Sequence, residues 1–250
     1  MTRKFFLVFI IFICLPNIFP DNRDTISTLN PPMFSRIMEA QDLRTQGKMT
    51  EAIAKYREAI TLAKKDTKAE FESYIHCRIS IAEIYTYGTV FGKFTPPEPS
   101  AREELWDKAI KEYQAIVEEI KGKENWINQE KYPYLYSIKK EAQFNLAVHY
   151  RIKGKEQEAS QILIPLSQEL KPFESVMEKI RKNDPSLKEE MITLGEAGVT
   201  TKTRNISPVA INSLSYLSRD VTNERENKIT TDMLLHPEKY PITKCNPKEK

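Results

Sequence analysis

Glycine is scarce in this chain, with 7 residues among 250. The phosphate-binding loops of nucleotide-binding folds need glycines at fixed spacings, and the sequence contains neither GxGxxG nor GxxxxGK. Its 3 cysteines include no CxxC pair, so no zinc or redox motif is present. The HExxH motif of metalloproteases and the GxSxG motif of hydrolases are also absent. The sequence therefore predicts that the protein is not an enzyme and holds no metal and no cofactor.

A strong excess of one charge is missing as well. The formal net charge is +3, and two of the positive charges, Arg3 and Lys4, stand in an N-terminal segment that we interpret as a targeting signal. The remainder of the chain therefore carries only about +1, spread over its length. Because nucleic-acid binding requires clustered basic residues, we expect no nucleic-acid partner.

The first 20 residues, MTRKFFLVFIIFICLPNIFP, have the order of a secretory signal. Two basic residues precede an unbroken apolar run from Phe5 to Leu15, which Pro16 ends. The run is shorter than the roughly 20 residues that a membrane-spanning helix needs, although an uncleaved signal anchor stays open as an alternative. We expect an exported protein, in the periplasm or the cell envelope, followed at 21–32 by a polar, proline-containing linker.

Cys14 ends the sequence IFIC, which resembles a bacterial lipobox, where a cysteine becomes the lipid-bearing first residue. Ile13 departs from that pattern, which has a small residue before the cysteine. The alternative is that Cys14 is simply part of the apolar run. We therefore expect membrane contact only through the N-terminal signal or a lipid anchor.

Two segments about a hundred residues apart share one pattern. In both, a glycine follows an alanine by 7 residues and a second alanine by 12. The anchors are Ala40, Gly47 and Ala52 in one segment and Ala147, Gly154 and Ala159 in the other. Apolar residues around them recur at helical spacing, and a glycine commonly ends a helix. Each segment is therefore predicted to be two helices joined by a short turn.

This pattern resembles the tetratricopeptide repeat, a helix–turn–helix of about 34 residues. The first unit matches it with Ala40, Leu43, Gly47, Ala52, Tyr56 and Ala59. A later unit matches with Leu146, Ala147, Tyr150, Gly154 and Ala159, but has Leu163 and Leu166 where the family has an aromatic residue and a last alanine. Between them, Ile81, Ala82, Tyr85, Ala109, Tyr113 and Ile116 suit a middle unit with a longer turn.

We therefore predict an all-α fold, a helical-repeat solenoid of about three such units with insertions and a C-terminal capping helix. The repeat domain covers 33–182, with units at about 33–66, 73–120 and 138–171 and a cap at 172–182. Residues 183–250 are predicted to be a poorly defined, partly disordered extension, in which Ser207 and Pro208 could start a short helix.

Two insertions interrupt the predicted repeats, at 89–104 and at 121–137. The first contains prolines, which exclude helix, and Ser100 with Glu103 forms a capping box that predicts where a helix restarts. The second is rich in aromatic residues and is interpreted either as a binding element or as a loop that packs over the side of the solenoid.

The resemblance implies a concave groove lined by the first helix of each unit. Its partner-binding residues would be Phe34, Ile37, Gln41 and Arg44, then His76, Ile79, Glu83 and Thr86, then Glu141, Phe144, Val148 and Arg151. The alternative for Ile37, Ile79 and Phe144 is that they only pack between repeats. Of the family's carboxylate-clamp positions only Asn145 is kept, so binding of a chaperone's C-terminal tail is not expected.

Three functions stay open at this level. The first is a non-catalytic scaffold that binds a protein or peptide on its repeat surface. The second is a structural component that self-associates or docks into a membrane complex. The third, a degenerate hydrolase with a site in 195–245, has only scattered polar residues in its favour.

Overall fold

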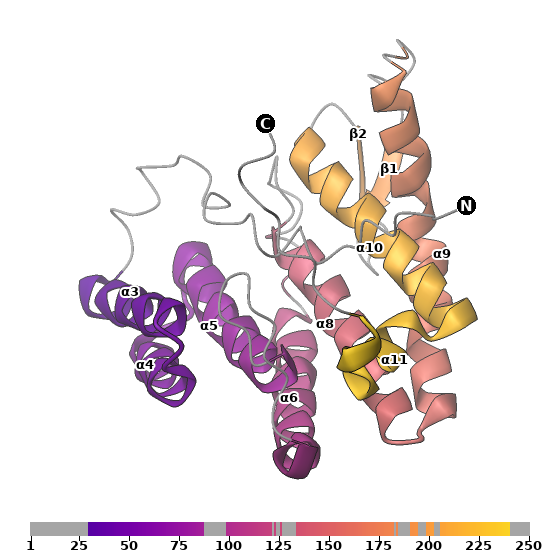
Figure 1. Cartoon of the computed structure of the whole chain (residues 1–250). Coiled ribbons are helices and arrows are strands. Elements are labelled where there is room, and N and C mark those ends of the chain that lie inside the picture. Colours follow the sequence, from indigo (N-terminus) through magenta and orange to yellow (C-terminus); the bar gives the residue numbers. More distant parts are fainter. Residues whose placement is uncertain are drawn as a thin grey trace, which may run out of the picture. The chain divides into compact units, whose positions relative to one another are not determined.

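The structure, a computed structural model, describes residues 30–87, 99–121, 123, 126, 134–182, 184, 191–194, 199–202 and 206–240. This part of the chain is helical except for one short hairpin (Figure 1). The all-α class is therefore confirmed. The helices are α3 (Pro31–Thr45), α4 (Met49–Leu62), α5 (Lys68–Tyr87), α6 (Pro99–Ile120), α8 (Tyr134–Ile152), α9 (Glu156–Arg181), α10 (Pro208–Asn227), α11 (Ile229–Leu235) and the 3-10 turn η3 (Pro237–Lys239).

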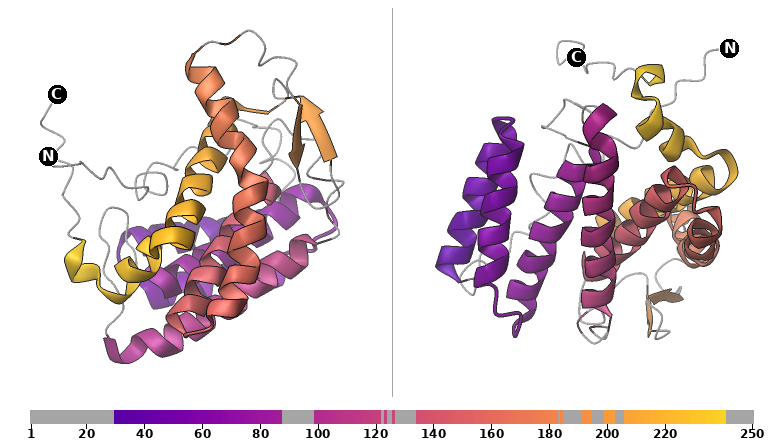
Figure 2. Two further views of the ribbon diagram at one scale, coloured as in Figure 1. Left: turned by 90° about the vertical axis from the view of Figure 1, so that its right-hand side faces the viewer. Right: turned by 90° about the horizontal axis from the view of Figure 1, so that it is seen from below.

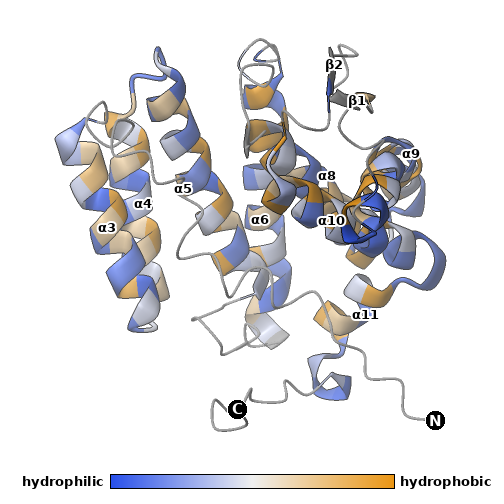
Figure 3. Cartoon of the chain, turned by 90° about the horizontal axis from the view of Figure 1, so that it is seen from above, coloured by the Kyte–Doolittle hydropathy of each residue, from blue (hydrophilic) through white to orange (hydrophobic). Residues whose placement is uncertain are grey.

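The chain divides into two compact units. The described part of one, here called the N-terminal unit, comprises α3, α4, α5 and α6 up to Tyr113, together with α11 and η3. The C-terminal unit runs from Gln114 to Asn227 and holds the end of α6, then α8, α9, the hairpin and α10. The labelled helices carry both hydrophobic and hydrophilic residues (Figure 3), and the hydrophobic ones supply each unit's core.

The turn between α3 and α4 is built on a left-handed glycine. Gly47 has a φ of 80°, a conformation that a side chain disfavours. Its N–H donates to the carbonyl of Arg44 (3.1 Å), and the N–H of Lys48 donates to the carbonyl of Leu43 (2.9 Å). This pair of bonds is a Schellman motif, which satisfies carbonyls at the end of a helix and reverses the chain.

The turn between α8 and α9 repeats these bonds one for one. Gly154 has a φ of 72° and donates to the carbonyl of Arg151 (2.8 Å), while Lys155 donates to that of Tyr150 (2.8 Å). In both places the two helices lie side by side (Figure 2). The predicted repetition of a helix–turn–helix at these two places is confirmed.

Small residues let the paired helices approach closely. Ala40, Ala52 and Ala59 are fully buried in the first hairpin, and Ala147 and Ala159 in the second. The predicted bulky neighbours are also buried: Tyr56, Leu163 and Leu166. The patterning that predicted these hairpins thus identified their cores.

The predicted middle unit is present as α5 and α6. Ala82, Ala109 and Tyr113 are fully buried, and the hydroxyls of Thr86 and Tyr113 are 3.2 Å apart. The predicted capping box is wrong, because α6 already begins at Pro99. Proline suits a first helical position, since its fixed φ is helical and its missing N–H would have no partner there. The end of the predicted insertion 89–104 is therefore helical, and its residues before Pro99 lie outside the described part.

The predicted boundary between the third unit and the cap is wrong. One helix, α9, runs from Glu156 to Arg181 and passes through Pro165 and Pro172. Proline usually breaks a helix, but here tertiary packing overrides that tendency, because α9 packs on both α8 and α10. Its last turns bury Phe173 and Val176.

The extension after residue 182 holds more structure than predicted. Strands β1 (Met191–Leu194) and β2 (Val199–Lys202) pair antiparallel. The predicted short helix is α10, which has 20 residues and packs on α9 and α8. Its buried face is Ala210, Ile211, Leu214, Ser215, Ser218, Val221 and Glu224. Since three of these seven residues are polar, their periodicity did not appear as an apolar stripe.

Candidate functional site

Four of the predicted groove residues in the N-terminal unit contact one another. Arg44 on α3 forms an ion pair with Glu83 on α5, with an Nη2–Oε2 distance of 2.8 Å. The Nε2 atoms of Gln41 and His76 are 3.5 Å apart across the same two helices. The Arg44 and Glu83 side chains are only 16% and 11% exposed. These polar groups therefore hold α3 against α5, a role that their predicted positions did not reveal.

The electrostatics of this cluster favour one fixed state. Burial, and to a smaller extent the nearby Arg44 charge, lower the pKa of His76 to about 4, so its imidazole is neutral at pH 7. Burial disfavours the charge on Arg44, but Glu83 and Tyr56 outweigh it, and the pKa of Arg44 is raised. Burial also raises the pKa of Tyr56. The arginine charge is thus compensated within the chain.

The other predicted groove residues of this unit are mostly core. Ile37 and Ile79 are each 3% exposed, and Thr86 is 1% exposed. Phe34 is half-buried. Burial of the two isoleucines is what the packing alternative predicted.

In the C-terminal unit, α10 covers the predicted groove residue Arg151. The Arg151 Nη1 atom lies 3.0 Å from Oε1 of Glu224 and also donates to the main-chain carbonyl of Glu224. The two side chains are 5% and 0% exposed. Arg151 Nε reaches Glu156 at 3.2 Å as well. This arginine is therefore part of the attachment of α10 to α8, and sequence analysis did not identify Glu224 as its partner.

The remaining predicted residues of this unit line α8. Phe144 and Val148 are 6% and 0% exposed, which again agrees with packing for Phe144. Glu141 is half-buried, and its main-chain carbonyl accepts a bond from Asn145 Nδ2 at 3.1 Å. The twelve predicted residues thus form two internal clusters, one in each unit.

The aromatic insertion 121–137 overlaps α8, which begins at Tyr134. Tyr136 is fully buried and donates its hydroxyl to Glu169 Oε1 (3.1 Å), while the buried Lys140 Nζ lies 2.7 Å from Glu169 Oε2. Burial and then the Glu169 charge raise the pKa of Tyr136. Tyr136 is therefore a packing residue. Apart from Lys121, Lys123, Trp126 and 134–137, the insertion lies outside the described residues.

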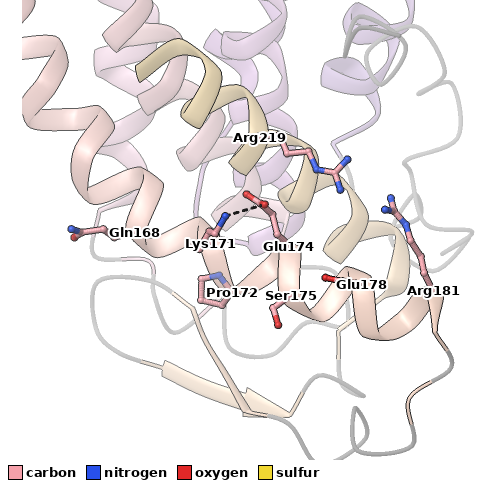
Figure 4. Close-up of a pocket in the computed structure, with 8 residues that line it drawn as sticks. All are labelled: Gln168, Lys171, Pro172, Glu174, Ser175, Glu178, Arg181 and Arg219. Atoms are coloured by element: carbon pink, nitrogen blue, oxygen red, sulfur yellow. Dashed lines mark hydrogen bonds and ion pairs between the residues drawn. The ribbon is translucent and has the colours of Figure 1, made fainter. Parts of the chain in front are cut away.

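A cavity of about 720 Å³ opens between α9 and α10 (Figure 4). Its polar walls include Gln168, Lys171, Glu174, Glu178 and Arg181 of α9 and Arg219 of α10. Glu174 accepts from Ser218 (2.6 Å) and pairs with Lys171 (3.2 Å). Sequence analysis assigned this stretch of α9 to a cap with a polar outer face. The helix positions of its charges were readable, but the wall supplied by α10 was not.

Other chemistry-bearing residues give no second site. No group of three His, Cys, Asp or Glu residues within the described ranges is arranged to hold a metal ion. Cys77 is buried, which raises the pKa of its thiol to about 12 and leaves it unreactive. The proposed lipidation residue Cys14 lies outside the described residues. None of the described helices has both the length and the apolar character needed to cross a bilayer.

Comparisons with protein-family models, with curated proteins and with solved structures gave no match for this chain.

Proposed function

We propose that the protein is a non-catalytic helical-repeat scaffold, similar to tetratricopeptide-repeat proteins, that binds a protein or peptide. The observation that carries the proposal is the repeated hairpin. Two helix pairs, 107 residues apart, reverse the chain on the same left-handed glycine with the same pair of hydrogen bonds. Helix pairs of this kind can stack on one another into an extended surface.

A preformed helical surface suits binding without chemistry. A stack of rigid helices loses little conformational freedom when a partner docks, so more of the contact energy appears as affinity. The ion pairs Arg44–Glu83 and Arg151–Glu224 add to that rigidity, because each joins two helices through side chains that are mostly buried. The proposal therefore assigns these residues to holding the binding surface in shape.

The proposed location is the cell envelope. It depends on the order of charges and apolar residues in 1–20, which suits export, and on Cys14, which would anchor the mature chain if lipidated. Metabolic labelling with a palmitate analogue tests this, with Cys14→Ser as the control. Labelling that is lost in Cys14→Ser supports the anchor.

The scaffold proposal is tested by affinity capture from envelope extracts with the full chain. Changing Arg44 or Arg151 would be a poor probe, because each change also breaks a buried ion pair. Better probes are two exposed apolar residues, Met38→Asp in the N-terminal unit and Ile164→Asp in the C-terminal unit, whose side chains belong to residues 42% and 48% exposed.

A partner that binds the purified chain again at defined stoichiometry supports the proposal. Loss of that binding in only one of the two variants assigns the contact to one unit. If light scattering shows that the chain only associates with itself, the scaffold reading fails in favour of a structural, self-assembling component.

A further inference from the structure

We propose that the cavity between α9 and α10 binds an acidic peptide segment in an extended conformation. This inference rests on the proposed scaffold function and names the chemistry of its partner. It differs from the predicted groove, because neither α10 nor the face of α9 that lines the cavity contributes any of the twelve predicted residues.

The two acidic side chains in the cavity wall are already neutralised by the chain itself. Both oxygens of Glu174 are occupied, one by the Ser218 hydroxyl at 2.6 Å and the other by Lys171 at 3.2 Å. Glu178 pairs with Lys182 at 2.7 Å. Neither carboxylate is therefore available to compensate a further cation.

Two guanidinium groups are left over on the cavity rim. Arg181 and Arg219 line the same cavity and, among the described residues, neither forms a hydrogen bond or an ion pair (Figure 4). The only close contact of Arg219 is with the Tyr216 ring, at 5.6 Å. Burial raises the pKa of the neighbouring Asp220 to about 8, so this carboxyl is mostly uncharged at pH 7 and leaves the Arg219 charge uncompensated. The rim thus attracts anions, and guanidinium groups bind carboxylates with two parallel hydrogen bonds.

The wall also has a main-chain acceptor. Pro172 lies inside α9 and has no N–H to donate, so the carbonyl of Gln168 lacks its usual donor four residues later in the helix. Both residues line the cavity. A peptide can supply an N–H to this carbonyl and a carboxylate to the arginines, whereas a phosphate ion at neutral pH offers mainly acceptors.

The dimensions suit a short segment. The lining of α9 extends from Gln168 to Arg181, which is about 20 Å at 1.5 Å rise per residue. An extended peptide covers that distance with about six residues. A single small anion would occupy only one end of such a surface.

The test uses the full chain and fluorescein-labelled, capped hexapeptides. One set carries two glutamates at every spacing among serine and alanine, and a matched set carries glutamines in their place. We expect binding of glutamate peptides, measured by anisotropy, to be about twentyfold weaker in Arg181→Gln/Arg219→Gln, at about fivefold for each exposed charge pair. Pro172→Ala, which restores an N–H for the Gln168 carbonyl, should weaken binding about threefold to fivefold.

The matched control removes two exposed lysines of the N-terminal unit. Lys48→Gln/Lys111→Gln makes the same change in net charge and should leave peptide binding unchanged. Circular dichroism confirms that each variant remains helical. Millimolar inorganic phosphate should not displace the peptide.

Equal binding of glutamate and glutamine peptides, or equal affinity in the native chain and the double arginine variant, would overturn this inference. Full displacement by phosphate would also overturn it, in favour of a simple anion site. If an envelope partner is captured equally by the native chain and the double arginine variant, the scaffold function stands and only this site is refuted.

Discussion

The attachment of α10 gives the sharpest prediction. Arg151→Met removes the guanidinium from an ion pair whose two side chains are 5% and 0% exposed, and it leaves the Glu224 carboxylate buried without that charge. Breaking a buried pair by removing one partner costs about 3–5 kcal/mol. For a chain of this size such a loss lowers the melting temperature by about 6–20 °C.

The assay combines urea unfolding with hydrogen exchange, and the amides of α10 should lose protection first. The double variant Arg151→Met/Glu224→Met should recover most of the stability, because an apolar pair of similar volume can replace a buried ion pair. Glu178→Gln is the control. It removes an exposed pair with Lys182, 66% and 70% exposed, and should cause no measurable change. A loss below about 1 kcal/mol in Arg151→Met, or a double variant as unstable as the single one, would refute the reasoning.

Three further outcomes are expected. Gly154→Ala should destabilise the chain by about 1 kcal/mol in thermal unfolding, because the φ of 72° strains a side chain although nothing lies within 4 Å of the added Cβ. Pro165→Ala and Pro172→Ala should each stabilise by about 2 kcal/mol, since an interior proline costs about 3 kcal/mol in a helix and returns about 1 through the unfolded chain; unchanged melting would contradict this. Burial lowers the pKa of His149 to about 4, below its unfolded value near 6.5, so stability should fall as the pH drops from 6.5 to 4, by at most about 1.4 kcal/mol per pH unit, and His149→Gln should flatten urea midpoints measured across that range.

The sequence predicted those parts of the fold that local rules determine. The hairpins α3–α4 and α8–α9 follow from small residues, helical spacing and glycines that must be left-handed, all within about 20 residues. The continuity of α9 through Pro172 could not be predicted in this way, because it depends on packing against α8 and α10. The two strands are only four residues each, too short to show a clear alternation.

The candidate sites were predicted less completely, because pairings over long separations leave no local signal. The sequence placed Arg44 and Glu83 on the right helices, but their ion pair joins residues 39 positions apart. Arg151 finds Glu224 at a separation of 73. The cavity was missed for the same reason, since Arg219 reaches it from α10.

The ion pair between Arg151 and Glu224 also sets a clock for the newly made chain. Ribosomes add about 5–20 residues per second, so about 4–15 s pass between the synthesis of Arg151 and that of its partner. Throughout that interval α8 and α9 exist without the helix that later covers them, and their apolar residues are open to other chains. A chaperone or export factor that binds nascent chains would find its longest opportunity there, and truncation before residue 208 would make that exposure permanent.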